Sequence, residues 1–355
     1  PIRPIQYTVE SEAFQLPTPV RTGYIFLGWT GEGITEPQKT IEIPQGSTGD
    51  RTYTANWQVI EYTIITLLEG GNAGSSQVYF YTVEQTVTLP TPTRTGYTFL
   101  GWTGEGITTP QPNVTIPKGS TGDKKYIENW ELTEYNITMD LDGGSGQEKV
   151  VYTITDEEFE LPTPTRNGYE FVGWTGERIT TPQTSVKIPK GSTGNKAYTA
   201  NWKVIRYTIT LVTNGGAVIA SIRYTVEDSV TLPIPPDRPG YEFAGWVLDG
   251  SGQFPSTPMI IPAGSTGDRL YKAEWRVATY TITYVSHGKA YNWVQYTINN
   301  QVYFGTPEED PSYYLPGYTF VGWKIDGVEG TPRSYMLPKG SYGNRTATML
   351  WEPIP

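Results

Sequence analysis

The stretch Gly96-Tyr-Thr-Phe-Leu-Gly-Trp102 decides the fold, because its pattern Gly-Tyr-x-Phe-x-Gly-Trp occurs five times in the chain. The copies end at Trp29, Trp102, Trp174, Trp246 and Trp323, with successive spacings of 73, 72, 72 and 77 residues. A second tryptophan follows each copy, at Trp57, Trp130, Trp202, Trp275 and Trp351. Self-similarity at a fixed period is the signature of a tandem array of small units. These ten tryptophans are predicted to be the structural anchors of the repeats.

The period divides the 355 residues into five predicted units. They are repeat 1 (1–58), repeat 2 (59–131), repeat 3 (132–203), repeat 4 (204–276) and repeat 5 (277–355). Repeat 1 is predicted to lack its first strand, since Tyr7-Thr-Val-Glu10 already matches Tyr81-Thr-Val-Glu84. That strand is expected to come either from upstream sequence or from a neighbouring molecule. Repeat 5 diverges, and atypical terminal repeats are common where a stack is capped.

Repeat 2 illustrates the expected secondary structure. The alternating stretches Tyr62–Leu67 and Val78–Val83 predict a hairpin whose turn is the cluster Glu69–Gly74. The prolines of Leu89–Gly96 cannot donate ladder hydrogen bonds, so this stretch is expected to cross the module in extended form. Pro117–Asp123 is interpreted as a single short helical turn, with Asp or Asn always at its last position.

Strand periodicity gives a prediction for the core face of the deciding stretch. With period two, Tyr97, Phe99 and Gly101 share one face, and Trp102 lies on the other with Leu100. The tyrosine and phenylalanine side is expected to face the core. The recurrent glycine at position 101 is expected to allow close approach of another backbone or ring.

Composition narrows the function classes. The chain has 39 glycines, 29 prolines and 13% aromatic residues, which favours an all-β protein. The net charge of −10 argues against a nucleic-acid partner, and the absence of cysteine excludes disulfides and thiolate sites. No apolar run approaches the ~18 residues of a membrane span. Pro1 at the first position is interpreted as the start of a processed product or an excised fragment.

Several motifs contain residue types that serve in catalysis or metal binding, but a structural role is the preferred interpretation of each. His287 follows Ser286, but adjacency is not triad geometry, so a surface-turn histidine is expected. Asp140–Gly146 and Glu308–Asp310 are weak cation candidates, for which a hairpin turn and a solvated loop are preferred. A Lys–Asn isopeptide bond and a carboxylate pair for glycoside hydrolysis stay as minor alternatives. Their residues, Lys118 with Asn129 and the turn acids Glu32, Glu105 and Glu177, do not recur in every repeat. No metal, cofactor or catalytic residue is predicted.

The strongest ligand-binding candidates are aromatic residues of repeat 5. Trp293 is the one tryptophan outside the repeat pattern, and Tyr291, Trp293 and Gln295 are expected to share a strand face. Aromatic faces suit sugar stacking and protein hot spots. Further aromatic residues are concentrated in the same repeat: Tyr284, Tyr296, Tyr303, Tyr313 and Tyr314.

Three features of the chain resemble the Listeria–Bacteroides repeat family, which includes the B repeats of internalin-type surface proteins. They are the Gly-Gly hairpin turn, the run Leu-Pro-Thr-Pro-x-Arg-x-Gly-Tyr-x-Phe-x-Gly-Trp, and the closing Ala-Asn-Trp. Examples are Gly143-Gly144, Leu89–Trp102 and Ala200–Trp202. The resemblance covers nearly the whole chain and implies compact β-grasp-like modules within long bacterial cell-surface proteins.

The expected molecule is therefore a mainly β, non-enzymatic rod of five modules. Its junctions, such as Trp57–Ile64, contain no glycine or proline and are expected to be stiff. The predicted function is an extracellular stalk or fibre-forming region that holds or links adhesive parts. Its expected partners are neighbouring modules or copies of the same chain. The alternative is an adhesin whose repeat 5 binds a glycan or host protein.

Overall fold

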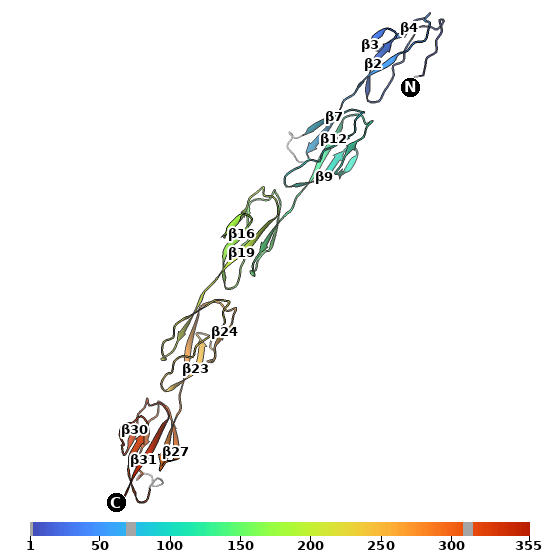
Figure 1. Cartoon of the computed structure of the whole chain (residues 1–355). Helices are drawn as coiled ribbons and strands as arrows, with labels where there is room; N and C mark the ends of the chain where they lie inside the picture. The colour runs from blue at the N-terminus through green and yellow to red at the C-terminus, as the bar shows by residue number, and fades with distance from the viewer. Residues whose placement is uncertain (1–2, 69–75, 308–314) are drawn as a thin grey trace. The chain divides into compact units, whose positions relative to one another are not determined.

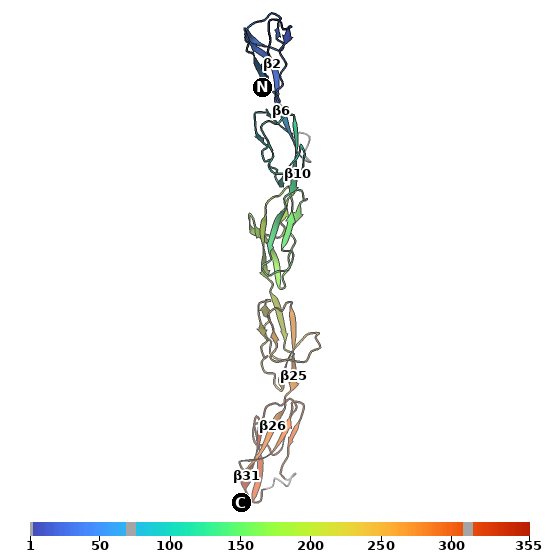
Figure 2. The ribbon, with the colours of Figure 1, turned by 90° about the vertical axis from the view of Figure 1, so that its right-hand side faces the viewer.

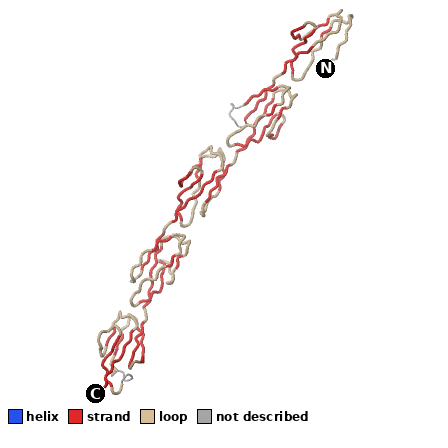
Figure 3. Tube along the Cα trace, in the orientation of Figure 1, coloured by secondary structure: helices blue, strands red, loops and turns tan. Residues whose placement is uncertain are grey.

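The computed structural model describes residues 3–68, 76–307 and 315–355. Every regular element in these ranges is a β-strand, and none of the described residues forms a helix (Figure 3). The chain divides into two compact units, Pro1–Thr138 with Lys149–Leu161 and Val186–Ala197, and Met139–Glu148 with Pro162–Ser185 and Tyr198–Pro355. The predicted fold class, mainly β and built from repeated sheet units, is confirmed. The finer description as β-grasp-like stays a prediction.

Repeat 2 shows the complete module, a mixed sheet and a short ribbon. The sheet has the order β10-β9-β12-β6-β7, in which β6 and β12 run parallel and the other neighbours antiparallel. Its strands are β6 (Tyr62–Leu68), β7 (Gln77–Tyr81), β9 (Tyr97–Gly104), β10 (Ile107–Gln111) and β12 (Lys124–Leu132). The ribbon pairs β8 (Val87–Thr88) with β11 (Thr115–Ile116). The predicted hairpin is the pair β6–β7, and its turn at 69–75 lies outside the described residues.

Repeats 4 and 5 have the same plan, except that their described sheets have four strands and no counterpart of β10. The sheet of repeat 4 has the order β21-β20-β25-β23. Its strands are β20 (Tyr207–Val212), β21 (Ile222–Tyr224), β23 (Tyr241–Leu248) and β25 (Arg269–Val277). A ribbon of β22 (Val230–Thr231) and β24 (Ile260–Ile261) accompanies the sheet. The sheet of repeat 5 has the order β27-β26-β31-β29. Its strands are β26 (Tyr280–Ser286), β27 (Lys289–Tyr296), β29 (Tyr318–Ile325) and β31 (Arg345–Pro353). The ribbon of this repeat pairs β28 (Val302–Phe304) with β30 (Tyr335–Leu337). In both repeats the last strand, here called the closing strand, runs parallel to the first, the opening strand. Figure 2 labels the opening and closing strands of repeat 5, β26 and β31.

Repeats 3 and 1 provide the remaining strands. In repeat 3, β13 (Tyr135–Asp140) pairs β14 (Lys149–Tyr152), β16 (Tyr169–Gly176) pairs β17 (Ile179–Gln183) and β19 (Lys196–Val204), and β15 (Phe159–Glu160) pairs β18 (Lys187–Ile188). Figure 1 shows β16 beside β19. Repeat 1 has the sheet β3-β2-β5, from β2 (Tyr24–Gly31), β3 (Ile34–Gln38) and β5 (Thr54–Val59), with a ribbon of β1 (Phe14–Gln15) and β4 (Glu42–Ile43). Among its described residues no strand precedes β1.

The prediction that Trp102 lies on the face opposite Phe99, away from the core, was wrong. The ladder between β9 and β12 pairs Phe99 with Trp130 and Gly101 with Asn129, which leaves Leu100 as a bulge. The extra residue shifts the alternation, so Trp102 turns to the same side as Phe99. Trp102 is 1% exposed and Leu100 is 43% exposed. The register shift recurs in every repeat, and a simple period of two cannot reveal it.

The recurrent glycine of this bulge meets another backbone, as predicted. A Cβ added at Gly101 would lie 2.4 Å from the backbone carbon of Gln111 on β10. The predicted helical turn at Pro117–Asp123 was wrong. It is a turn in which Ser120 N–H donates to Pro117 O at 3.1 Å, and Gly119 and Gly122 have φ of +93° and +80°. Those angles lie outside the right-handed helical region.

The core is divided among the repeats. In repeat 2 the buried cluster gathers residues from the sheet, the ribbon and the crossing segment: Ile64, Tyr81, Leu89, Trp102, Val114, Ile116 and Tyr126. Repeats 4 and 5 have corresponding clusters around Trp246 and Trp323. The cluster of repeat 1 is smaller, with Trp29, Ile41 and Ile43 as its buried members.

Candidate functional site

The first glycine of the repeated pattern forms a notch that a side chain of the next repeat fills. A Cβ at Gly96, where φ is +77°, would lie 2.6 Å from Ile154 Cγ2 of repeat 3. The same contact joins Gly23 to Val83, Gly168 to Val226 and Gly240 to Ile298. Gly317, the equivalent in repeat 5, has no described atom within 4 Å of an added Cβ. Glycine is therefore needed at four junctions for close packing as well as for its backbone angle.

A local turn holds the β-branched side chain that fills the notch. In repeat 2, Thr82 N–H donates to Gln85 Oε1 at 2.9 Å, and Gly119 N–H donates to Val83 O at 2.8 Å. The first bond recurs in the other repeats with Ser11, Asp156, Asp228 and Asn300 as acceptors. Sequence reasoning missed this element. Its signal was a β-branched residue after Tyr-Thr in all five repeats: Val9, Val83, Ile154, Val226 and Ile298.

Two residues separate the closing strand of one repeat from the opening strand of the next, and the first of them binds the notch. Thr133 N–H donates to Gly96 O at 3.0 Å. Ile60, Ile205 and Ala278 donate to the matching glycines at 2.9 to 3.0 Å. At two junctions the neighbouring tyrosine also reaches across, Tyr24 to Glu84 and Tyr169 to Glu227. The hydrogen bond to the carboxylate raises the pKa of both tyrosines above its ordinary value.

An arginine stacks on the tyrosine beside each of the four filled notches. Its guanidinium carbon lies 3.6 to 4.0 Å from the ring centroid in the pairs Arg21–Tyr24, Arg94–Tyr97, Arg166–Tyr169 and Arg238–Tyr241. Stacking of this kind contributes about 0.5–1 kcal/mol at exposed sites. Leu315 takes the arginine's place in repeat 5, so the unfilled notch also lacks this stack.

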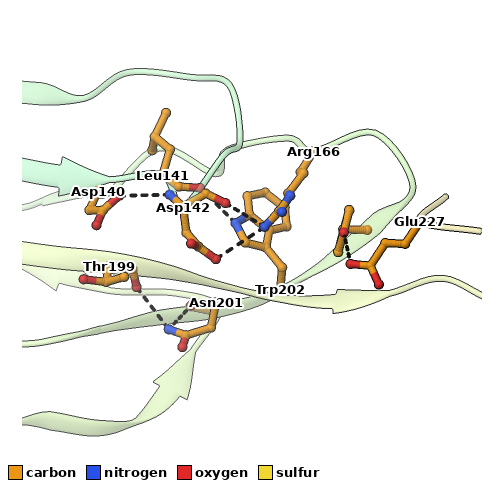
Figure 4. A network of polar contacts seen from close by, with 10 residues as sticks. Asp140, Leu141, Asp142, Arg166, Thr199, Asn201, Trp202 and Glu227 are labelled. Atoms are coloured by element: carbon orange, nitrogen blue, oxygen red, sulfur yellow. Dashed lines mark hydrogen bonds and ion pairs between the residues drawn. The ribbon is translucent and has the colours of Figure 1, made fainter. Parts of the chain in front are cut away.

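The two tryptophan series lie in different environments. Trp29, Trp102, Trp174, Trp246 and Trp323 are 7, 1, 0, 1 and 3% exposed, whereas Trp57, Trp130, Trp202, Trp275 and Trp351 are half-buried. The second series caps hairpins in two repeats, where Trp202 Nε1 donates to Leu141 O at 2.9 Å and Trp275 Nε1 to Thr213 O at 2.8 Å. Figure 4 shows Trp202 against Leu141.

The asparagine before the second tryptophan supports the bulge. Asn129 Nδ2 donates to Gly101 O at 3.1 Å, to Thr103 Oγ1 at 3.0 Å and to Ile127 O at 3.0 Å. Asn56 and Asn201 make the same bonds, and Figure 4 shows Asn201 beside Thr199. The amide that an isopeptide bond would consume is thus part of the strand framework.

The acidic loop of repeat 3 is a braced hairpin turn. Asp140 Oδ1 accepts the backbone N–H of Asp142 at 3.0 Å. Arg166 Nη1 donates to Asp142 O at 2.6 Å and contacts Asp142 Oδ2 at 3.3 Å, which Figure 4 shows from close by. These contacts engage the acids in turn formation, the preferred interpretation of the loop.

The Asp or Asn that ends the Pro-x-Gly-Ser-Thr-Gly stretch holds the opening strand. Asp123 Oδ1 accepts the backbone N–H of Thr63 at 2.8 Å, the second residue of β6. Asn195, Asp268 and Asn344 accept the equivalent N–H of Asn136, Thr208 and Thr281 at 2.7 to 2.9 Å. The sequence showed that the position is always Asp or Asn but gave its role as a local turn. Its main partner is instead about 60 residues away.

The predicted ligand residues of repeat 5 are separated by a bulge in β27. The ladder pairs Thr283 with Trp293 and Tyr284 with Asn292, and then skips Tyr291. Trp293 is 64% exposed, whereas half-buried Tyr291 packs toward Met349 and lines a hollow of about 370 Å³. The two side chains therefore do not form one flat aromatic platform. Tyr313 and Tyr314 lie outside the described residues.

His287 lies at the tip of the β26–β27 hairpin. Its Nδ1 is 3.0 Å from Ser286 Oγ, which also accepts Trp351 Nε1 at 3.2 Å. The imidazole stacks on Trp351 with a centroid separation of 6.1 Å and an interplanar angle of 24°. The histidine and serine together secure the closing tryptophan to a surface turn.

The recurring turn acids also bind backbone. Glu105, at a φ of +45°, accepts Lys125 N–H at 3.2 Å, and Glu32 accepts Thr52 N–H at the same distance. No group of three or more His, Cys, Asp or Glu among the described residues is arranged to hold a metal ion. The candidate Glu308–Asp310 lies outside the described ranges.

The described residues form an all-β tandem array, in which the same glycine contact joins neighbouring repeats at four junctions. This arrangement places the chain in the class of tandem-repeat proteins. The Listeria-Bacteroides repeat domain matches the chain five times, at residues 4–56, 62–125, 135–201, 207–266 and 280–339. The chain belongs to this family.

Three proteins with a known source organism are similar to parts of this chain. A protein described as a Gly-rich membrane protein of Evansella cellulosilytica is 26% identical over 323 residues, which are 86% of this chain and 36% of that protein. A second protein of that organism, described as a membrane protein, is 24% identical over 78% of this chain and 41% of its own length. Internalin H of Listeria monocytogenes is 32% identical over 83 residues, 23% of this chain and 15% of its own. The chain thus spans well under half of these relatives. In the described part of this chain, no helix has the length and apolarity to cross a membrane.

Proposed function

We propose that this chain is an extracellular, non-enzymatic structural region of a bacterial surface protein, which holds or links adhesive parts at a distance. One observation carries the proposal: the glycine notch and its β-branched side chain recur at all four junctions with the same backbone hydrogen bond. A junction with specific packing and a two-residue connection restricts the angles between neighbours. The family match and the internalin relative support a location at the cell surface.

The distance between the chain ends tests this function. The full chain would be tethered by one end and labelled at the other, beside a variant that lacks residues 132–203. A strand length of roughly ten residues at ~3.3 Å each gives about 33 Å per repeat. We expect the shorter chain to lose about this distance. An unchanged end-to-end separation would contradict a stalk.

A second function, an adhesin module in repeat 5, is favoured by the 64% exposure of Trp293 and the hollow lined by Tyr291. Its ligand would be a glycan or a host protein that stacks on aromatic rings. Screening the full chain on a glycan array tests it, with Trp293→Ala as the binding variant. Phe80→Ala is a matched control, because Phe80 is a 61% exposed aromatic on the corresponding strand of repeat 2. Equal binding by all three proteins would exclude Trp293 as a contact.

A further inference from the structure

The chain contains two Asn-Gly pairs, Asn167–Gly168 and Asn214–Gly215. In such a pair the backbone nitrogen of the glycine can attack the side-chain amide carbon of the asparagine. Glycine has no Cβ, so it leaves this approach open. Whether the attack takes place depends on how firmly the fold holds the amide, and the two pairs differ in this respect.

The fold holds the amide of Asn214 in place. This residue follows β20 in the hairpin of repeat 4 and has a φ of +47°. Its Nδ2 donates to Ala273 O of the closing strand at 2.8 Å. The side chain must break this hydrogen bond before its amide carbon can turn toward Gly215 N.

Asn167 occupies an exposed position in the turn that precedes β16. The turn is closed by Tyr169 N–H, which donates to Arg166 O at 3.1 Å, and Gly168 has a φ of +79°. Within the described ranges of the chain, the side chain of Asn167 has no hydrogen-bond partner. Its amide can therefore rotate toward Gly168 N, and water reaches it from the solvent.

Gly168 is also the notch glycine at the junction between repeats 3 and 4. A Cβ at Gly168 would lie 2.5 Å from Val226 Cβ, and Gly168 O accepts Ile205 N–H at 2.9 Å. The other four repeats have Thr or Pro in the position of Asn167, at Thr22, Thr95, Pro239 and Pro316. Repeat 3 is therefore the one repeat with an Asn-Gly pair at its notch.

We propose that Asn167–Gly168 is a site of spontaneous modification, at which loss of the side-chain amide alters the junction between repeats 3 and 4. Gly168 N forms a bond to Asn167 Cγ, the Cγ–Nδ2 bond breaks, and the proton of Gly168 N leaves with the amide nitrogen as ammonia. Water then opens the five-membered imide. Attack of water at Cγ gives aspartate. Attack at the backbone carbonyl gives isoaspartate, in which the main chain runs through the former side chain.

The two products act differently on the junction. Isoaspartate lengthens the main chain before Gly168 by one carbon–carbon bond, about 1.5 Å. The packing of Gly168 against Val226 has no room for such a shift, because a single added carbon would already clash. A displacement of this size also opens the hydrogen bond from Ile205 to Gly168 O. Aspartate keeps the length of the main chain and adds only a charge.

Ageing of the full chain in neutral and mildly alkaline buffers, prepared with water that carries a heavy oxygen isotope, is the test. Peptide mapping by mass spectrometry should find labelled aspartate and isoaspartate in place of Asn167. The conversion should be faster in the alkaline buffer, because the attacking nitrogen must lose its proton. Asn214 should react about fivefold more slowly, the effect of one hydrogen bond that must first break. An intact amide at Asn167, or equal rates at the two asparagines, would overturn the proposal.

Two substitutions at the notch test the role of the turn. Asn167→Thr, which introduces the residue of repeats 1 and 2, should keep the junction unchanged during ageing. Thr95→Asn should introduce the reaction at the junction between repeats 2 and 3, since Gly96 has a φ of +77° and Tyr97 N–H closes the same turn. A Thr95→Asn chain that keeps its amide would contradict the claim that this turn permits the attack.

Hydrogen exchange at Ile205 measures the effect on the junction. Its N–H should exchange faster in the aged chain, in proportion to the isoaspartate formed. Freshly prepared Asn167→Asp is the control, because it has the charge of the product without the longer main chain, and its exchange at Ile205 should match that of the fresh chain. Unchanged exchange in the aged chain, or equally fast exchange in Asn167→Asp, would overturn the proposed effect of main-chain lengthening.

Discussion

Single side chains with distant partners set the stability of each repeat. Asp123 is exposed, yet its carboxylate binds the start of β6, 60 residues earlier in the chain. Trp102 is the largest side chain of the repeat 2 core. Each gives a prediction that a single substitution can test.

Asp123 makes the stability of repeat 2 depend on pH. The hydrogen bonds from Thr63 hold the pKa of this carboxyl below its ordinary value. The stabilisation is therefore complete above the ordinary aspartate pKa of about 3.9 and is lost as pH falls through the lowered pKa. Asp123→Asn should remove this dependence, since an amide oxygen accepts the same bond at every pH. Urea melts from neutral to acidic pH, with exchange at β6 as readout, should show a smaller acid loss in the variant; parallel curves would refute it.

Trp102→Ala should destabilise repeat 2 by about 3–5 kcal/mol, because it removes a buried aromatic side chain and leaves a cavity. Trp293→Ala is the control, and its 64% exposed side chain should cost less than about 0.5 kcal/mol. Urea melts with repeat-resolved hydrogen exchange would measure both. A loss under about 1 kcal/mol for Trp102→Ala would mean that the indole contributes little to the core.

At the scale of elements, the bulge in β9 places the core tryptophan, and the junction contact joins one repeat to the next. The bulge at Leu100 rotates Trp102 inward, and the adjacent glycine lets β10 approach. The notch at Gly96 then receives Ile154 of the next repeat. These features lie on one continuous stretch, so the core and the junction are linked through β9.

Gly96→Ala should uncouple repeats 2 and 3. The new Cβ would meet Ile154 at 2.6 Å, and any residue other than glycine is strained at φ +77°. Gly317→Ala is a matched control, because φ there is +81° but no described atom lies within 4 Å. We expect faster exchange at Thr133 and around Ile154 in Gly96→Ala, and only local effects in Gly317→Ala. If both variants behave alike, backbone strain rather than the junction contact explains the glycine.

At the scale of the whole molecule, the prediction concerns extension in solution. Five repeats of about 33 Å would form a rod of about 165 Å with a radius of gyration near 48 Å. A single globule of this chain length would have a radius of gyration of ~20 Å. The net charge of −10 discourages repeats from folding back on one another. Small-angle scattering in moderate salt should give the larger value. A radius near 20 Å would contradict the stalk and favour a composite site between repeats.

The sequence by itself determined the number of repeats, the all-β class, the hairpins and the need for glycine beside each buried tryptophan. Those properties follow from local rules: period, turn chemistry and the limits on φ.

Only the tertiary structure decided which face of the deciding stretch is buried, since one bulged residue reverses the alternation. It also decided the roles of Asp123 and Ile154, whose partners are 60 and 58 residues away in the sequence. The separation of Tyr291 from Trp293 depends on a second bulge in the same way. Contacts of this kind depend on strand order and register, which local sequence patterns do not specify.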